Sequence, residues 1–146
     1  MKRFLSVLSA AIVLLFTQCE TIQKLPTNTS GGLFSLNGQW QLTSSSDSKN
    51  LEGMVVSVIP GFAEATVQNL PVNNASCVRE KDAYWRSVKS DQNGGFLADL
   101  LVSACTGSPA YKPATIAVIS NNEVRIKTVS PANTEVLQTW TRVTAK

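Results

Sequence analysis

Few side chains in this chain are of the kind that catalyse reactions. Its 146 residues include no histidine, which removes the Ser-His-Asp and Cys-His arrangements and the usual zinc sites. The ten Asp and Glu residues are scattered rather than grouped as metal ligands, and no Gly-rich phosphate loop is present. We therefore expect no enzyme activity, no metal and no cofactor. The reactive side chains that remain are three cysteines, Cys19, Cys77 and Cys105, and no C-x-x-C pair occurs among them.

The first of these cysteines ends a segment with the layout of an export signal. Lys2 and Arg3 precede a mostly apolar run over residues 4–16, and Cys19 follows shortly after it. A basic region followed by an apolar region is typical of a secretory signal, and this run is too short to cross ~30 Å of hydrocarbon as a helix. Because Cys19 stands where a cleavage site normally has a small residue, the segment resembles the lipobox of bacterial lipoproteins. The alternative is an ordinary secretory signal with an unrelated cysteine.

The lipobox resemblance implies that residues 1–18 are a signal peptide and that Cys19 carries the lipid. Phe16 and Gln18 depart from the family pattern, which prefers Leu and a small residue at these two positions. A lipidated cysteine holds a protein on a membrane, because each buried methylene contributes ~0.8 kcal/mol. Glu20, rather than Asp, follows the cysteine, which favours the outer membrane of a bacterial cell envelope.

Assigning Cys19 to the lipid leaves two cysteines in an oxidising compartment. Two cysteines allow one pairing, so we expect a disulfide between Cys77 and Cys105. The formal net charge of +3 falls to +1 when Lys2 and Arg3 leave with the signal. No basic run and no stripe of basic and aromatic residues remains, so nucleic acid is not an expected partner.

The rest of the chain divides into a linker and one domain. Residues 19–36 are expected to be the lipidated cysteine and a flexible linker, because Ser, Thr, Asn, Gly and Pro dominate its first part. A coil of this kind spans on the order of 20 Å. Leu33, Phe34 and Leu36 are expected to form a short turn that closes one end of the domain. Residues 37–146 are enough for one domain with a modest core.

The domain is predicted to be all-β. From Gly38 onward the apolar runs are short, rich in β-branched and aromatic residues, and bounded by turn residues, and no ten-residue stretch has convincing helical periodicity. Eight strands are expected, at residues 38–44, 53–59, 64–70, 82–89, 95–103, 114–120, 123–129 and 135–143, with residues 107–113 as one of the separators. Eight strands with short connections predict an antiparallel up-and-down sheet that closes into a barrel.

Two hairpins predict which residues face each other. A two-residue turn at Asn121-Asn122 gives the expected pairs Ser120–Glu123, Ile119–Val124 and Ala117–Ile126. A turn through residues 91–94 gives the expected pairs Ser90–Gly95, Val88–Leu97, Arg86–Asp99 and Trp85–Leu100. The first hairpin then has one apolar and one mixed face, as a half-buried sheet requires.

The first and last strands carry a family signal. Gly38 and Trp40 form a Gly-x-Trp in the first strand, and Arg142 lies on the last. In a closed barrel these strands are neighbours, and a guanidinium stacks well on an indole face, so the pair would plug an open end. Lipocalins begin their barrel with Gly-x-Trp and pack an arginine across it. The chain resembles the small bacterial lipocalin-like lipoproteins, which are calycin-type β-barrels, because the domain is short.

Two sets of side chains are candidates for binding. Apolar residues that would line a cavity in the barrel are Met54, Val56, Val58, Trp85, Phe96, Leu100 and Trp140; the alternative is that they fill a small core. Arg86 and Asp99 form the charge pair that the register places. An exposed pair of this kind contributes at most ~1 kcal/mol, whereas on an inward face it would be a polar anchor for a ligand head group.

These observations predict a monomeric, lipid-anchored envelope protein that binds a small apolar or amphipathic molecule without chemical change. Its partners would be the membrane, through the lipid, and a small hydrophobic ligand. A first alternative is a protein-interaction module, since some lysozyme inhibitors are also small lipid-anchored eight-stranded barrels with a disulfide and act through their loops. A second alternative is a structural role in the envelope without a specific ligand.

Overall fold

The computed structural model describes residues 33–59, 61, 63–105 and 107–144. The predicted signal peptide, the predicted lipidation site Cys19 and the first part of the linker lie outside the described residues. No helix in the described ranges is long and apolar enough to cross a bilayer.

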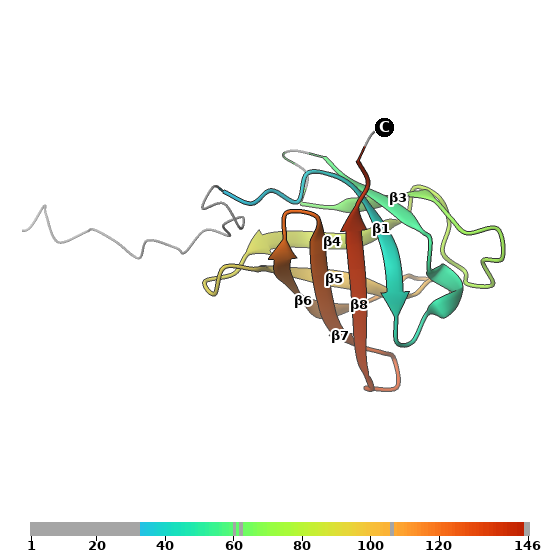
Figure 1. The fold of residues 1–146 in the computed structure, drawn as a ribbon. Helices are drawn as coiled ribbons and strands as arrows, with labels where there is room; N and C mark the ends of the chain where they lie inside the picture. The colour runs from blue at the N-terminus through green and yellow to red at the C-terminus, as the bar shows by residue number, and fades with distance from the viewer. Residues whose placement is uncertain (1–32, 60, 62, 106, 145–146) are drawn as a thin grey trace, which may run out of the picture.

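Within the described residues, eight antiparallel strands form a closed barrel in which β8 returns to pair with β1 (Figure 1). The strands are β1 (Gly38–Ser45), β2 (Val55–Val58), β3 (Ala65–Asn69), β4 (Ala83–Ser90), β5 (Phe96–Ser103), β6 (Ala110–Ser120), β7 (Glu123–Val129) and β8 (Glu135–Arg142). A short 3-10 helix, η1 (Lys49–Leu51), follows β1. The predicted all-β, up-and-down, closed barrel is therefore confirmed, and it is consistent with a calycin-like fold.

The sixth strand is longer than the sequence predicts, so the separator expected at residues 107–113 is wrong. β6 begins at Ala110 and includes Pro113, which lies opposite Asp99 of β5. In an antiparallel ladder the N–H and the carbonyl of one residue point to the same neighbour. The Pro113 carbonyl accepts a hydrogen bond from Thr128 Oγ1 of β7 at 2.8 Å, so the missing N–H lies on the β7 side. The strand tolerates proline because its pairing with β5 loses no hydrogen bond.

A bulge changes the register of the β6–β7 hairpin. The turn pair is as predicted, but Ile119 is an extra residue, so Val118 lies opposite Val124. Ile119 turns outward, with 43% of its surface exposed. One extra residue reverses which side chains face the core. Two predicted pairs are therefore wrong, Ile119–Val124 and Ala117–Ile126.

A second bulge lies in β4 at Ser87, whose φ of 55° is in the left-handed region that few non-glycine residues adopt. Beyond it Lys89, and not Val88, lies opposite Leu97. Two predicted pairs are confirmed on the near side of the bulge, Arg86–Asp99 and Trp85–Leu100. Two predicted pairs beyond it are wrong, Val88–Leu97 and Ser90–Gly95.

The two ends of the barrel differ in how they are closed. We call the end at which β1 begins and β8 ends the N-terminal end. There Phe34 and Leu36 are buried, and the Phe34 ring lies 6.2 Å from that of Trp40 and 6.1 Å from that of Phe96. The segment before β1 thus covers the mouth of the barrel, while Leu33 stays exposed.

The opposite end carries the predicted disulfide, which is confirmed. Cys77 and Cys105 are bonded, and they join the loop after β3 to the loop after β5. The first of these loops is also held by its own side chains, because Asn74 Nδ2 donates to the Val78 carbonyl and Asn74 Oδ1 accepts from the Ser76 amide. This loop is therefore fixed by covalent and polar contacts rather than by strand pairing.

Removing the disulfide should destabilise the fold without changing it. The bond closes a loop of 28 residues, so the double variant Cys77→Ala/Cys105→Ala should lose about 3–4 kcal/mol of unfolding free energy through the greater entropy of its unfolded chain. Urea titration followed by tryptophan fluorescence measures this loss. A reducing agent should lower the stability of the wild type by a similar amount and leave the variant unchanged; equal stability of all four samples would contradict the assignment.

Candidate functional site

The interior of the barrel is occupied by large apolar side chains. Trp40, Trp85 and Trp140 have no exposed surface, and the rings of the last two meet edge to face with 5.0 Å between centroids. All seven predicted cavity-lining residues point into the barrel or its mouth, and six of them belong to one buried cluster, Met54, Val56, Val58, Trp85, Leu100 and Trp140. Phe96 is partly buried and packs against that cluster at the N-terminal end. Two of the seven, Val58 and Phe96, also line a hollow of about 340 Å³ at the mouth.

A short chain of hydrogen bonds, which no sequence pattern predicted, runs inside this core. Trp140 Nε1 donates to Gln138 Oε1 at 3.0 Å, and Gln138 Nε2 donates to the Tyr84 hydroxyl at 3.1 Å. Burial raises the pKa of Tyr84 to about 12, although the hydrogen bond with Gln138 acts in the opposite direction. The chain satisfies an indole, an amide and a phenol that would otherwise be buried without partners.

The Trp85 indole differs from this arrangement. Its Nε1 is buried and has no hydrogen-bond partner among the described residues. An unpaired buried donor costs about 1–3 kcal/mol. The apolar packing of this ring against Trp140 and Leu100 offsets that cost.

The predicted closure residues meet at the N-terminal end. Trp40 and Arg142 are register partners, and the guanidinium carbon lies 4.3 Å from the centre of the indole. The guanidinium also donates to three backbone carbonyls, those of Ser35, Asn37 and Asn121. Partial burial lowers the pKa of Arg142. The arginine therefore ties together the segment before β1, the β6–β7 turn and the last strand.

Gly38 makes room for this contact. Its φ is +113°, and a Cβ at this position would lie 3.2 Å from Arg142 Nη1. Any other residue would meet both backbone strain and a crowded guanidinium.

The predicted polar anchor lies on the outside of the barrel. Arg86 Nε and Asp99 Oδ2 are 4.0 Å apart, and the two side chains are 46% and 37% exposed. The Arg86 guanidinium stacks on the ring of Tyr111, 3.6 Å from its centre. The inward position considered for this pair is wrong, because the strand pleat puts the neighbouring Trp85 inside and Arg86 outside. The pair does not reach the interior.

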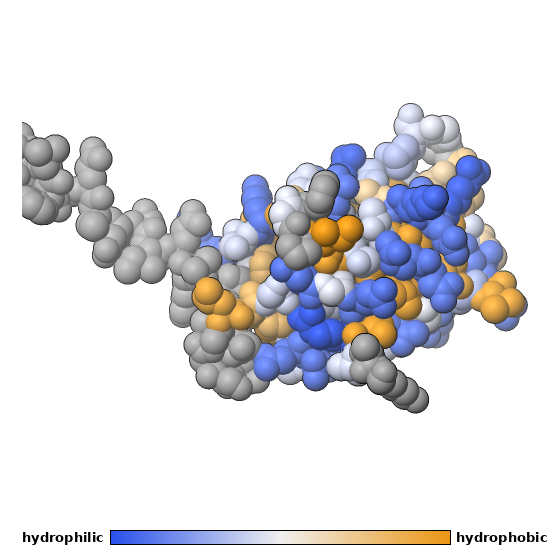
Figure 2. Space-filling view, turned by 90° about the horizontal axis from the view of Figure 1, so that it is seen from above, coloured by the Kyte–Doolittle hydropathy of each residue, from blue (hydrophilic) through white to orange (hydrophobic). Residues whose placement is uncertain are grey.

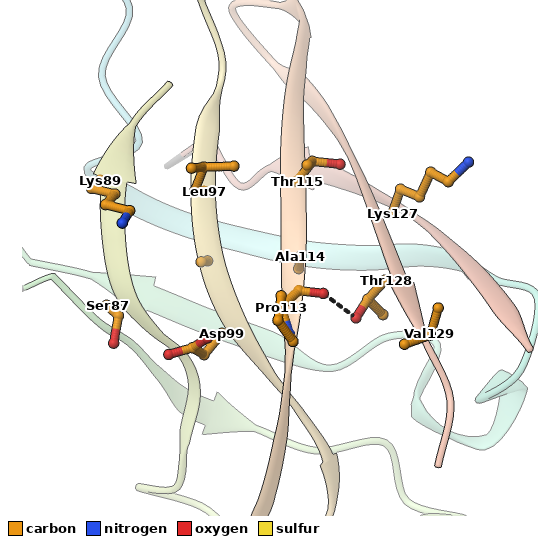
Figure 3. Close-up of a pocket in the computed structure, with 11 residues that line it drawn as sticks. Ser87, Lys89, Leu97, Asp99, Pro113, Ala114, Thr115, Lys127, Thr128 and Val129 are labelled. Carbon is orange, nitrogen blue, oxygen red and sulfur yellow. Dashed lines mark hydrogen bonds between the residues drawn. The ribbon is translucent and has the colours of Figure 1, made fainter. Parts of the chain in front are cut away.

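A hollow of about 520 Å³ lies on the outer face of the barrel, over β4, β5, β6 and β7 (Figure 3). We call it the outer groove. Its apolar lining is formed by Leu97, Ala98, Pro113, Ala114 and Val129. Its volume lies within the ~300–1,000 Å³ that is usual for small-molecule sites.

One row of residues crosses the outer groove in register. Lys89 lies opposite Leu97, Leu97 opposite Thr115, and Thr115 opposite Lys127. All four side chains are exposed or half-buried, and Figure 3 shows them aligned across the four strands. The row therefore places a lysine at each side of an apolar and hydroxyl centre.

The two irregularities of the sheet explain why the surface is hollowed here. The bulge at Ser87 displaces β4 on one side of the groove. On the other side, the β6–β7 register pairs end at Thr115 and Lys127, and the hydroxyl of Thr128 takes the place of a backbone bond to Pro113. Two small residues of the core, Ala98 and Ala114, lie at the floor of the outer groove. A convex barrel wall thereby gains a concave patch.

The charges around the outer groove are unequal. Lys127 forms an ion pair with Glu135, and Asp99 faces Arg86. Among the ion pairs of the described residues Lys89 takes no part. The cation most available to a bound molecule is therefore the Lys89 ammonium.

The outer groove was not predicted from the sequence. Its residues come from four strands and read as ordinary outward positions, so no local pattern marks them. The available signal was Pro113 within an otherwise strand-like stretch, since proline in a sheet indicates a bulge or an unpaired side.

Comparison with protein-family models, with curated proteins and with solved structures finds no match to this chain. The interpretation of the site therefore depends on its own geometry.

Substitution of Arg142 should test the closure contact. Arg142→Lys keeps the charge but loses the planar stack and most of the carbonyl contacts, so the free energy of unfolding should fall by about 2 kcal/mol. Arg125→Lys on the outer face of β7 is the matched control and should change stability by less than about 0.5 kcal/mol. Urea titration of the three proteins gives the comparison, and equal losses for the two variants would contradict the closure role.

The buried phenol predicts a loss of stability in alkaline solution. In the unfolded chain Tyr84 ionises near pH 10.0, whereas in the fold it keeps its proton to about pH 12. Between these values the folded state binds more protons, so the free energy of unfolding falls as pH rises, by about 2–3 kcal/mol in all. Tyr84→Phe should flatten this fall, although its stability at neutral pH is lower. Burial also raises the pKa of the partly exposed Tyr111, so Tyr111→Phe is the comparison and should flatten the fall less than Tyr84→Phe does. A fall of unchanged steepness in Tyr84→Phe would refute the assignment.

Proposed function

We propose that this protein is a lipid-anchored protein of the bacterial cell envelope, related to the small lipocalin-like lipoproteins, that binds an apolar or amphipathic molecule in the outer groove without catalysis. The observation that carries this proposal is the hollow of about 520 Å³ on the outside of β4–β7, whose exposed lining surface is mainly apolar. An eight-stranded barrel is a fold compatible with ligand binding.

The outer groove suits a ligand better than the interior of the barrel does. Ligands in larger barrels occupy space that side chains leave free. Here three indoles and Tyr84 occupy that space, and each has at most 2% of its surface exposed. A molecule inside would have to displace side chains from a packed core, whereas the outer groove is open to solvent.

The lining of the outer groove indicates the chemistry of the ligand. Leu97, Pro113 and Val129 offer apolar contact, and Thr115 offers a hydroxyl. The Lys89 ammonium at one side suits an anionic head group. An acyl chain or another apolar body with a carboxylate or phosphate at one end fits this arrangement.

The envelope location is supported by the N-terminal sequence. A basic region, an apolar run and Cys19 have the order of a lipoprotein signal. The disulfide between Cys77 and Cys105 fits an oxidising compartment outside the cytoplasm. The absence of histidine from the sequence supports binding without the commonest kinds of acid–base catalysis.

A protein-interaction module is the second candidate, and one loop favours it. The loop that begins after β3 is fixed by the disulfide and by Asn74, and it presents Val72 with its surface fully exposed. A rigid loop with an apolar tip suits insertion into a pocket of another protein. The two candidates differ in whether Leu97 or Val72 matters for binding.

A panel of ligands tests the outer groove directly. The protein is titrated with a fluorescent anionic fatty acid and with a neutral apolar dye, and uptake is expected for both. Leu97→Ser should weaken uptake of both probes by about five- to ten-fold, because it removes apolar contact from the centre of the groove. Lys89→Gln should weaken uptake of the fatty acid more than that of the dye.

Leu137→Ser is the matched control, since Leu137 is an exposed leucine on the outer face of β8 and does not line the outer groove. Its affinities should equal those of the wild type. Absence of uptake in the wild type, or equal losses at positions 97 and 137, would overturn the proposal. Loss of binding to a purified envelope partner in Val72→Ser, with the barrel intact, would favour the second candidate.

A further inference from the structure

Large apolar side chains on the surface of the described residues gather at one end of the barrel. Leu33 is 70% exposed, Ile59 50%, Ile119 43% and Val143 40%. We call these four residues the apolar rim. Two other large apolar residues of the described part are highly exposed. Val72 lies at the opposite end, and Leu137 lies in the half of β8 nearer to that end.

Strand pairing and hydrogen bonds place all four residues of the apolar rim at the N-terminal end. Ile59 follows Val58, which pairs with the first residue of β1. The Val143 amide donates to the Gln39 carbonyl of β1. Ile119 precedes the β6–β7 turn, and Leu33 lines a small hollow that this turn shares with Arg142.

The apolar rim follows five neighbouring strands around this end, from β6 through β7, β8 and β1 to β2. Figure 2 looks down on the side where the C-terminus lies, and it shows apolar residues set between polar ones. Charges of both signs lie at the same end, among them Glu64, Glu123 and Arg142. The surface is thus apolar and of mixed charge rather than strongly basic.

The chain itself indicates what covers this surface. Residues 20–32 are all that separate Cys19 from Leu33, and a coil of that length spans on the order of 20 Å. A lipid on Cys19 therefore keeps the N-terminal end close to the bilayer, whereas the opposite end is a whole barrel length further away. An apolar side chain held at a bilayer surface gains free energy by entering the interface.

We propose that the N-terminal end is a membrane-docking surface, with the apolar rim inserted into the lipid interface. This inference rests on the proposed lipid anchor. Docking depends on apolar contact rather than on charge, so it is insensitive to salt and to the anionic lipid content. The barrel then stands on the membrane with the outer groove opening sideways, and Lys89, close to the β4–β5 turn, lies near the head groups.

The buried native tryptophans make a fluorescence experiment possible. Trp40, Trp85 and Trp140 have no exposed surface, so a tryptophan added on the outside is the one that reaches a quencher. The full chain is produced with its lipid and placed in phosphatidylethanolamine–phosphatidylglycerol vesicles. Leu33→Trp and Ile59→Trp report on the apolar rim, and Val72→Trp at the opposite end is the matched control. Brominated lipids quench from the bilayer, and iodide quenches from water.

At positions 33 and 59 we expect quenching by brominated lipids and protection from iodide by about three-fold or more compared with position 72. Added salt should not change this pattern. A triple variant, Leu33→Ser/Ile59→Ser/Val143→Ser, tests the same surface without new tryptophans: limited proteolysis at the β6–β7 turn should become faster on vesicles.

Flotation of the vesicles separates this inference from the proposed anchor. If the wild type floats with the vesicles but iodide quenches all three added tryptophans equally, the docking surface is refuted and the anchor stands. If neither the wild type nor Cys19→Ser floats, the anchor fails and the docking surface fails with it.

Discussion

The fold depends on one contact, that between the first and last strands at the N-terminal end. Trp40 and Arg142 are opposite each other in the β1–β8 pairing, and the guanidinium covers the indole while donating to three carbonyls from two other segments. A sheet of eight strands has two edges unless these strands meet. Arg142 thus stabilises the pairing of β1 with β8, the closure of the barrel mouth and the position of the segment before β1. The stack also needs Gly38, whose missing Cβ leaves space for the guanidinium.

Closure around three indoles has a consequence for function. A barrel of eight strands is only just wide enough for side chains or one small ligand. In this barrel the side chains of Trp40, Trp85 and Trp140 fill the interior. The site proposed for ligand binding therefore lies on the outer surface, where a barrel wall is normally convex. Two departures from regular pairing, at Ser87 and Pro113, make part of that wall concave. The outer groove is a product of local irregularity on a rigid support, which is a common basis for binding sites.

The fold was largely predictable, and the site was not, for different physical reasons. Short β-branched runs between turn residues indicate strands because alternation and breakers are local properties, and the strand count, the closure and the Cys77–Cys105 bond were all correctly predicted. The predicted strand registers were wrong beyond Ile119 and Ser87, because a bulge inserts one residue at each position. A bulge depends on the twist and the packing of the neighbouring strands, so the sequence of a single hairpin does not reveal it. Likewise, the sequence of β6 alone does not show that the missing N–H of Pro113 lies on the β7 side, where its absence removes no hydrogen bond to β5.

The sequence by itself determined the all-β class, the eight strands and the single disulfide pairing, because each follows from side-chain type and order along the chain. The prediction of an export signal likewise depends only on the order of basic, apolar and cysteine residues at the start of the chain. Only the tertiary structure decided that the aromatic residues fill the barrel, that Arg86 and Asp99 face outward, and that a groove lies across β4–β7. Those outcomes depend on the register between strands that are far apart in sequence. A register shift of one residue moves every side chain beyond it to the other face of the sheet.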